Sequence, residues 1–359
     1  MNKNLIYFCF FTFLVLIVCL FSPEFVEIIY GQWIYPSLRL VMNTLLFIFP
    51  LPLFLIFIPS TLLWFGYKLA VIWRFKNTGY KKKWKRSTAF VFKVILLVIC
   101  YFYWIWGLNY LRPSYEESLE LRLEAVEMER VFHLLEKWTE RVNADRTILT
   151  ALGYLEESDL FDHRTNYPIL VEGLNNFLIK HDYPQYREVP LRHWFPPGIL
   201  MRNGTAGMYF PFTGESTIDP GLHPIQIPFT AAHEIGHGVG FTDEGFCNLL
   251  ALVICLNSDD PFIRYSGSLV FWRHIARAAR SLDYDRYALF IDYALSEWVR
   301  ADLHSIYAHR DRYPDWFSGL QRRLYHTYLR AHGVREGVAS YNQLLMLAES
   351  YFELHGEGH

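Results

Sequence analysis

The sequence predicts a mainly α-helical protein, with three N-terminal transmembrane helices followed by an α-rich (α+β) soluble domain that contains a small sheet. Three observations predict this. Long apolar runs concentrate in the first 110 residues, helical periodicity dominates the remainder, and one segment combines aromatic and β-branched residues with glycine. With 359 residues, 52% of them hydrophobic, the chain is long enough for more than one structural unit.

Charge divides the chain into the same two parts. Residues 1–115 carry twelve Lys and Arg but only two acids, whereas residues 116–359 carry 34 acidic and 22 basic side chains. A basic, apolar part joined to an acidic part is typical of a membrane anchor followed by a water-soluble domain. The acidic balance argues against nucleic acid as a partner. We therefore expect an anchor at 1–110 and a soluble domain at 111–359.

Three apolar runs are long enough to cross a bilayer. The first, at about 5–21, ends without the small residues that signal peptide cleavage requires, which favours a retained anchor. The second, at about 40–65, contains three prolines, which a membrane helix tolerates where neighbours satisfy the freed carbonyls. The third, at about 88–108, ends in Trp and Tyr residues typical of a membrane interface.

The segment between the second and third runs predicts the topology. Lys68–Arg86 contains eight Lys and Arg and no acid, so it should remain in the cytoplasm. With three spans, the N-terminus is then cytoplasmic and the C-terminal domain extracytoplasmic. The same basic residues can bind anionic lipid headgroups, although a role in topology alone also accounts for them.

The first half of the soluble domain predicts one helix, one loop and one hairpin. Ser114–Asn143 carries apolar residues at helical spacing, and acids concentrate toward its start. The Tyr- and Pro-rich stretch Tyr183–Pro197 predicts an extended loop. Gly207–Ile218 is the best strand or hairpin candidate, because it combines aromatic and β-branched residues with glycine.

The second half predicts a series of helices. Thr230–Gly238 is expected to be helical, with Thr230 as a candidate N-cap and with Gly238 and Gly240 ending it. Glu244–Leu256 predicts the next helix, and Asn-Ser-Asp-Asp-Pro then predicts a break. From residue 265 to residue 353 the pattern is mostly helical.

Residues 233–237 have the sequence His-Glu-Ile-Gly-His. An α-helix advances about 100° per residue, so His233 and His237 project from one face about one turn apart. Two imidazoles at that spacing can bind one tetrahedral Zn²⁺, and Glu234 between them can reach a zinc-bound water. Such a motif also occurs by chance, and ordinary hydrogen-bonded histidines are the competing interpretation.

Glu244 is the favoured third ligand. Glu244 and Asn248 fit the gluzincin arrangement of Glu-x-x-x-Asp/Asn on a second helix, in which Glu binds zinc and Asn orients a ligand histidine. Asp243 is the alternative, at metzincin-like spacing with Gly240 turning the chain. That arrangement requires a downstream Met-turn, and Met346 is the only methionine after the motif. A more distant acid remains a third possibility.

Several segments together resemble a family catalogued as domain of unknown function 3810. They are Gly207–Glu215 (Gly-Met-Tyr-Phe-Pro-Phe-Thr-Gly-Glu), the His-Glu-Ile-Gly-His and Glu-x-x-x-Asn pair, and Arg-Tyr-Ser-Gly at 264–267. The resemblance covers nearly the whole chain. It implies a bacterial, membrane-anchored zinc metallopeptidase with a zincin-like, gluzincin-type domain. Where that family typically has Glu-Ala-Asn, this chain has Phe-Cys-Asn at 246–248, a difference that affects packing and not ligation.

These observations predict a zinc metalloendopeptidase that hydrolyses peptide bonds with a zinc-activated water and Glu234 as general base. Its expected partners are a peptide or protein substrate and membrane lipid. Tyr265, His326 and Tyr341 are candidates for stabilising the transition state, against the competing interpretation of packed aromatics or a surface histidine. The strand around 208–212 can pair with an extended substrate, or simply complete the sheet.

The main alternative is a non-proteolytic sensor or scaffold in the membrane that binds zinc or a peptide. The basic segment is too short for a cytoplasmic effector domain, and a purely structural zinc site has no need for Glu234. An intramembrane protease would carry the motif inside a span of about 20 apolar residues. The nearest apolar run, Phe246–Leu256, is about half that length, which argues against this class.

Overall fold

The computed structural model divides the chain into two compact units. The N-terminal unit comprises residues 1–113 and 210–215, and the C-terminal unit comprises residues 114–209 and 216–359. The structure describes residues 3–49, 51–74, 79–153, 163–316, 319, 323, 327 and 343–356. The predicted fold class is confirmed in its main features: the protein is mainly helical, with a small sheet and three apolar helices near the N-terminus.

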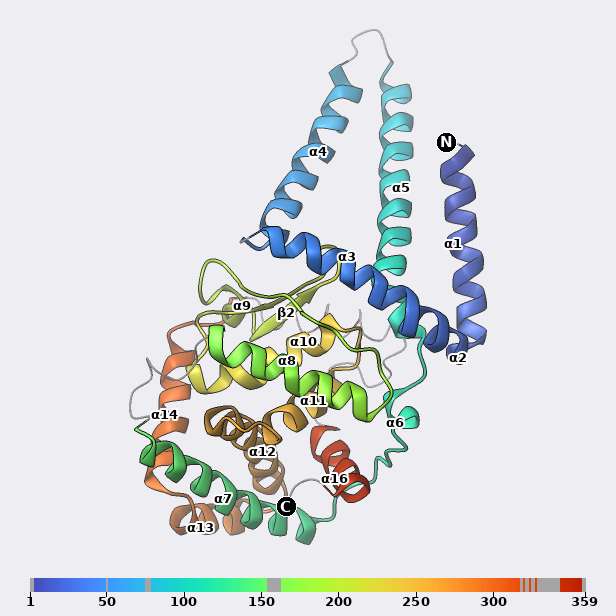
Figure 1. Ribbon diagram of the computed structural model, residues 1–359. Helices are drawn as coiled ribbons and strands as arrows, with labels where there is room; N and C mark the ends of the chain where they lie inside the picture. The colour runs from blue at the N-terminus through green and yellow to red at the C-terminus, as the bar shows by residue number, and fades with distance from the viewer. Residues whose placement is uncertain are drawn as a thin grey trace. The chain divides into compact units, whose positions relative to one another are not determined.

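The N-terminal unit consists of helices of very different length (Figure 1). Three of them, α1, α4 and α5, are long and apolar enough to cross a membrane. The elements are α1 Lys3–Phe21, α2 Pro23–Phe25, a π-helical segment Val26–Ile34, α3 Tyr35–Ile48, α4 Phe54–Arg74, α5 Tyr80–Ile105 and a 3₁₀ turn Gly107–Leu111.

The second span begins later than the sequence predicted. A single helix was expected over about 40–65, but α3 ends at Ile48 and α4 begins at Phe54. The sequence Pro-Leu-Pro at 50–52 explains the break, because proline lacks a backbone N–H and disfavours helical geometry in the residue before it. Pro59 lies inside α4 and is tolerated there, as expected. The helix boundaries therefore differ from the predicted limits, while the number of helices long and apolar enough to cross a membrane agrees with the predicted three.

The third span also differs from its predicted limits of about 88–108. Helix α5 begins at Tyr80 and ends at Ile105, so it contains most of the basic residues assigned to a loop. Arg74 ends α4, so Lys68–Arg86 comprises the facing ends of two helices and a short connection between them. Long basic side chains continue a helix readily, which is why charge alone did not mark its start.

Residues 210–215, the tip of a β-hairpin, form part of the N-terminal unit. The buried carboxylate of Glu215 accepts hydrogen bonds from two backbone N–H groups at the start of α4, at 2.7 and 2.9 Å. It thereby caps that helix, whose first N–H groups have no partner within the helix. Arg39 Nη1 donates to the carbonyl of Gly214 at 2.8 Å. Gly214 has φ +72°, and a Cβ there would lie 2.2 Å from Arg39 Nη1, so glycine is required.

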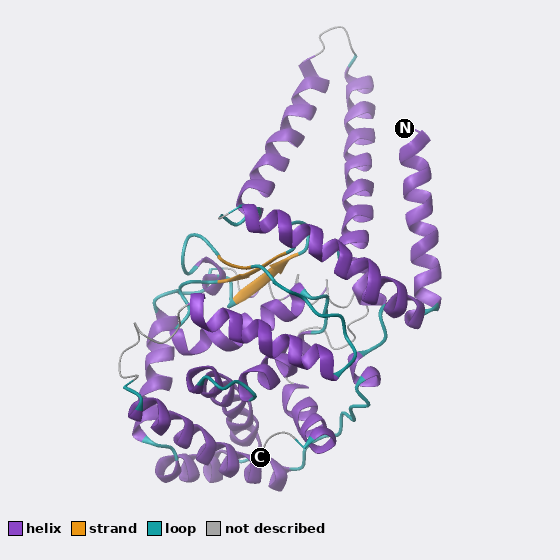
Figure 2. Cartoon of the chain, viewed as in Figure 1, coloured by secondary structure: helices purple, strands orange, loops and turns teal. Residues whose placement is uncertain are grey.

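The C-terminal unit combines helices with a three-stranded sheet (Figure 2). The strand order is β1-β3-β2, and β1 runs parallel to β3 with Leu191 opposite Ser216. The strands are β1 Leu191–His193, β2 Gly207–Phe210 and β3 Glu215–Ile218; the helices are α6 Tyr115–Ser118, α7 Met128–Ala151, α8 His163–Lys180, α9 Ile199–Arg202, α10 Ile227–Gly238, α11 Glu244–Leu256, α12 Pro261–Leu282, α13 Tyr284–Ala294, α14 Glu297–Asp311 and α16 Leu344–His355. The predicted hairpin at 207–218 is confirmed.

Helix α11 lies at the centre of this unit. Each residue from Glu244 to Cys255 is buried, as expected of a helix that is apolar on all sides. Helix α10 packs closely on it, because Gly236 has no side chain to hold the two helices apart: a Cβ there would lie 2.9 Å from Leu250 Cδ2. The limits predicted for α11 are confirmed, and the side chain of Asp243 caps its first turn by accepting from Phe246 N at 2.7 Å.

Two helix starts were predicted wrongly. The helix expected over Ser114–Asn143 is divided, because Glu120 adopts a positive φ of 55° after the short α6, and α7 begins only at Met128. Thr230 is not an N-cap, since α10 begins three residues earlier at Ile227. Pro228 lies in the first turn of α10, where a missing N–H has no intrahelical partner to lose.

His274 on α12 should make stability depend on pH. Burial, followed by the neighbouring Arg277 and Arg273, lowers its pKa from 6.5 to about 4. Between those values the folded protein binds fewer protons than the unfolded chain, so its stability is highest above pH 6.5 and falls as the pH drops toward 4. We expect His274→Gln to reduce the acid-induced decrease in the free energy of unfolding by about 1–3 kcal/mol.

The measurement is the melting temperature of the full-length protein in detergent at pH 4.5 and 7.5. The exposed His133→Gln is the matched control and should behave as wild type. Equal acid destabilisation of wild type and His274→Gln would show that this histidine does not contribute.

Candidate metal centre

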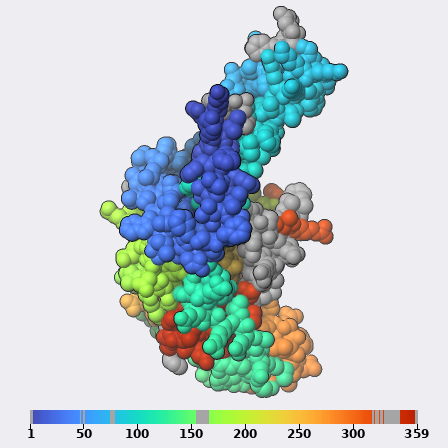
Figure 3. All heavy atoms as spheres, turned by 90° about the vertical axis from the view of Figure 1, so that its right-hand side faces the viewer, coloured from blue at the N-terminus to red at the C-terminus, as the bar shows by residue number. Residues whose placement is uncertain are grey.

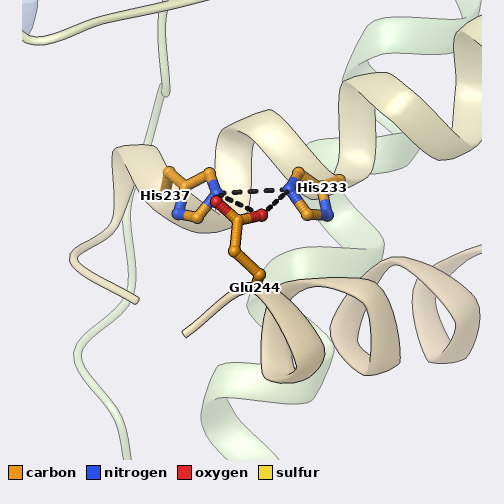
Figure 4. Close-up of side chains that lie close together, drawn as sticks. All are labelled: His233, His237 and Glu244. Atoms are coloured by element: carbon orange, nitrogen blue, oxygen red, sulfur yellow. Dashed lines mark hydrogen bonds and ion pairs between the residues drawn. The ribbon is translucent and has the colours of Figure 1, made fainter. Parts of the chain in front are cut away.

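His233, His237 and Glu244 converge in the core of the C-terminal unit (Figure 4). Each offers one ligand atom, and these atoms lie within 4.8 Å of one another. His233 Nε2 is 3.2 Å from His237 Nε2 and 3.1 Å from Glu244 Oε2, and His237 Nε2 is 3.6 Å from the same oxygen. The three residues that the sequence predicted as metal ligands are therefore brought together.

The chain between α10 and α11 explains why Glu244, and not Asp243, joins the histidines. Gly240 adopts φ +105°, a conformation that favours glycine, and so reverses the chain directly after α10. Glu244 is then the first residue of α11 and its carboxylate contacts His233. The carboxylate of Asp243 instead caps the same helix.

Hydrogen bonds at Nδ1 fix the orientation of both histidine rings. His233 Nδ1 lies 2.9 Å from Asn248 Oδ1, and His237 Nδ1 lies 2.8 Å from the carbonyl oxygen of Phe241. A carbonyl oxygen only accepts, so each Nδ1 carries a proton, and a ring without a second proton presents its Nε2 lone pair to its neighbours. Asn248 thus occupies the orienting position that the sequence predicted for it.

The donor set fits a divalent zinc ion. Two Nε2 lone pairs and one carboxylate oxygen face each other without a proton between the two rings, which is repulsive unless a cation or an added proton separates them. Ligands held at about 2.0–2.1 Å from a tetrahedral zinc lie about 3.3 Å apart. The observed separations of 3.1, 3.2 and 3.6 Å agree with that spacing.

The charges of the buried side chains also favour a cation at this site. Burial favours the neutral form of Glu244, but His237 and His233 hold its pKa well below the usual range, so the carboxylate is ionised. Burial opposes a charge on His237, but Cys247 and Glu244 raise its pKa well above the usual value. Burial raises the pKa of the Cys247 thiol to about 11, so Glu244 is the anion that matters at neutral pH. The site therefore favours added positive charge, which a metal ion also provides.

Glu234 lies beside this cluster with an unused acceptor. It is 5% exposed, and its Oε2 has no hydrogen-bond partner among the described residues. Burial raises its pKa to about 7. A buried carboxylate oxygen without a donor costs free energy, so its retention calls for a functional explanation.

The two strands of the hairpin hold Glu234 in place. A Cβ on Gly207 of β2 would lie 2.5 Å from Glu234 Oε1, so the carboxylate occupies the space that any larger residue would fill. Ser216 Oγ of β3 donates to the backbone carbonyl of Glu234 at 2.7 Å. The side chain and the backbone of Glu234 are thus each in contact with one strand.

Tyr265 was a candidate for stabilising the transition state, but its hydroxyl contacts residues outside the metal-ligand cluster. Its buried hydroxyl donates to Asp302 Oδ2 at 2.6 Å, and Arg146 Nε donates to the same oxygen at 2.7 Å. This network joins α7, α12 and α14, and the structure does not bring Tyr265 together with the metal-ligand cluster. The other two candidates for stabilising a transition state, His326 and Tyr341, lie outside the described residues.

Sequence reasoning missed two groups at the site. Gly207 was recognised only as part of a hairpin, although a glycine inside a strand often marks a close approach of another group. The Phe241 carbonyl carried no signal at all, because a backbone acceptor is the same for every residue. Its position depends on the turn at Gly240.

Asn248 should contribute to metal affinity without binding the metal. Asn248→Ala removes the acceptor for His233 Nδ1 and should weaken zinc affinity about 10–100-fold, because the ring loses its preferred orientation and tautomer. Asn248→Asp keeps an acceptor and should stay close to wild type. Competition with a chromogenic zinc chelator, using the full-length protein in detergent, measures this. Unchanged affinity in Asn248→Ala would rule out the orienting role.

Tyr265 should contribute to stability and not to metal binding. Tyr265→Phe leaves the partly buried Asp302 with one donor fewer and should lower the free energy of unfolding by about 1–2 kcal/mol. Zinc content should be unchanged. Thermal unfolding and elemental analysis of the same preparation test both statements. A loss of bound zinc at unchanged stability would instead connect Tyr265 to the metal centre.

Comparison with known proteins identifies the family of the chain but does not identify an activity. The family described as "Protein of unknown function (DUF3810)" matches residues 30–348, and the chain therefore belongs to it. No curated protein and no solved structure matches the chain.

Proposed function

We propose that this member of the family is a membrane-anchored, zinc-dependent peptidase in which Glu234 is the general base. The observation that carries the proposal is the unpaired, buried carboxylate of Glu234 next to three converging ligand atoms. A zinc site that only stabilises the fold is closed by its ligands and has no use for an additional carboxylate without a partner. Helix α10 contains one carboxylate and two imidazoles, and the sequence His-Glu-Ile-Gly-His contains all three.

His233, His237 and Glu244 would hold the zinc. The ion supplies Lewis-acid chemistry, in that it lowers the pKa of water to about 7 and polarises a carbonyl oxygen. Glu234 takes the proton from the attacking water and delivers it to the amine that leaves. Its burial supports this role, because a poorly solvated carboxylate is a stronger base than one in water. Asn248 keeps His233 in the tautomer that binds metal.

The sheet supports a peptide as the substrate. Strand β2 lies at one end of the strand order among the described residues, and Gly207 at its start touches Glu234. An extended peptide can add to such an edge through backbone hydrogen bonds, whatever its side chains. A peptide bond would then pass close to the general base.

The three apolar helices indicate a membrane anchor, and we propose an orientation for it. The connection between α4 and α5, with the adjoining helix ends, contains eight Lys and Arg over Lys68–Arg86 and no acid. An excess of basic residues favours the cytoplasmic side. The C-terminal unit, and with it the candidate metal centre, would then lie outside the cytoplasm.

A sensor is the second candidate function, and one observation favours it. The hairpin tip at 210–215 is part of the N-terminal unit, whereas Gly207 and Ser216, just outside the tip, touch Glu234. A ligand that displaces Glu234 would therefore act on the same hairpin that caps a membrane helix. Such a protein would bind zinc or a peptide without turnover.

Glu234→Gln separates the two functions. It should retain zinc and lower peptide cleavage by at least about 100-fold, because the amide cannot accept the proton. The assay is cleavage of a mixed peptide library by the full-length protein in detergent, with and without a metal chelator, alongside zinc content. His237→Ala is the matched control and should lose both zinc and cleavage.

Gly207→Ala offers an independent check, because its Cβ displaces the Glu234 carboxylate and leaves the ligands intact. It should also keep zinc and lose cleavage. Full cleavage by Glu234→Gln would end the general-base assignment. A zinc-loaded wild type that cleaves nothing in the library would favour the sensor.

A further inference from the structure

The polarity of α3 is reversed compared with a helix on the surface of a soluble protein. The side that faces the protein carries the polar groups, and the exposed side is apolar. The buried residues are Tyr35, Arg39, Asn43 and Leu46, and the exposed apolar residues are Leu40, Val41, Leu45 and Ile48, which are 67, 59, 53 and 68% exposed. The buried residues recur at intervals of three and four, as do Val41, Leu45 and Ile48, with Leu40 adjacent to Val41, so each set forms a continuous face.

The two polar residues on the exposed face satisfy their own hydroxyl groups. Ser37 Oγ donates to the carbonyl of Trp33 at 2.7 Å, and Thr44 Oγ1 donates to the carbonyl of Leu40 at 2.8 Å. A hydroxyl in lipid must find its partner within the helix, and both hydroxyls meet this requirement; exposed Thr147 on α7 makes the same bond, so the bond by itself does not indicate lipid. The exposed face therefore offers no unsatisfied donor to its surroundings.

The single charged residue of α3 points into the N-terminal unit. Arg39 is fully buried, and its Nη1 donates to the carbonyl of Gly214 at 2.8 Å. Sequence Tyr35–Ile48 contains no Asp, Glu or Lys, so no charge remains for the outer face. An arginine on the inner side of a helix with an apolar outer side is the arrangement that a lipid environment favours.

The length and surroundings of α3 indicate where this face lies. Helix α3 has 14 residues and directly continues the π-helical segment Val26–Ile34, in which Glu27 forms an ion pair with Arg112, so the combined helix is not a continuous apolar span. Helix α3 is steeply inclined to α4 and α5 (Figure 1), and candidate spans precede and follow it in the chain. In the space-filling view, the blue atoms of the first fifty residues form part of the surface (Figure 3). Trp33, 70% exposed, directly precedes it and is of the type that collects at membrane interfaces.

We propose that α3 is an in-plane membrane helix whose face of Leu40, Val41, Leu45 and Ile48 packs against the acyl chains of the bilayer. Lipid is favoured over a protein partner because the face is continuous in sequence with candidate spans on both sides and presents only apolar groups and satisfied hydroxyls. The N-terminal unit then has four membrane contacts, three that cross the bilayer and one that lies along its surface. This inference does not depend on peptidase activity.

Site-specific photo-crosslinking in the full chain tests the proposal. Leu45 is replaced by p-benzoylphenylalanine, and the protein is reconstituted into vesicles of phosphatidylethanolamine and phosphatidylglycerol and irradiated. Mass spectrometry then identifies the adducts. Leu62, 65% exposed on candidate span α4, is the positive control, and Leu289, 71% exposed on α13, is the control outside the spans.

Position 45 should form phospholipid adducts to about the same extent as position 62, and position 289 should form none. All three side chains are exposed, so the replacements leave the packed core intact. A crosslinked dimer at position 45, in place of lipid, would overturn the proposal in favour of a second copy of the chain. No adduct at position 45, with adducts present at position 62, would show a water-exposed helix and overturn it as well.

Discussion

The close packing of α10 on α11 is the contact on which the candidate site depends. Gly236 permits it, because any side chain there would collide with Leu250. Helical geometry sets the spacing of His233 and His237 within α10, but only this contact between helices brings Glu244 to them. The start of α11 is a favourable position for that carboxylate, because helix N-termini carry partial positive charge.

A bound cation would account for the burial of so many ionisable groups at the candidate metal centre. Ionised Glu244, and His237 with its raised pKa, show that the site is short of positive charge, and Glu234 retains an acceptor without a donor. In a buried region such groups destabilise the fold unless something binds there. A divalent cation and a water that donates its proton to Glu234 would meet both deficits, and for that reason the peptidase proposal accounts for more of the site than a structural role does.

The N-terminal unit shows the opposite distribution of polarity. Many of its exposed side chains are apolar, whereas inside it Glu215 caps α4 and Arg39 binds the carbonyl of Gly214. The hairpin tip supplies these contacts, so a segment far along the chain contributes to the packing of the long apolar helices. The unit is therefore more than three independent apolar helices.

The sequence by itself determined the features that depend on local periodicity and spacing. The limits of α11, the hairpin, the number of long apolar helices and the one-turn spacing of His233 and His237 all follow from periodicity and spacing along one helix or strand. Tertiary structure decided the rest: the partner of Tyr265, and the contact between Gly207 and Glu234. Those depend on packing between segments far apart in the chain, because a side chain carries no record of its neighbours in space. The prolines of Pro-Leu-Pro were evident in the sequence. Whether they end a helix or only kink it depended on whether neighbouring helices satisfy the freed carbonyls.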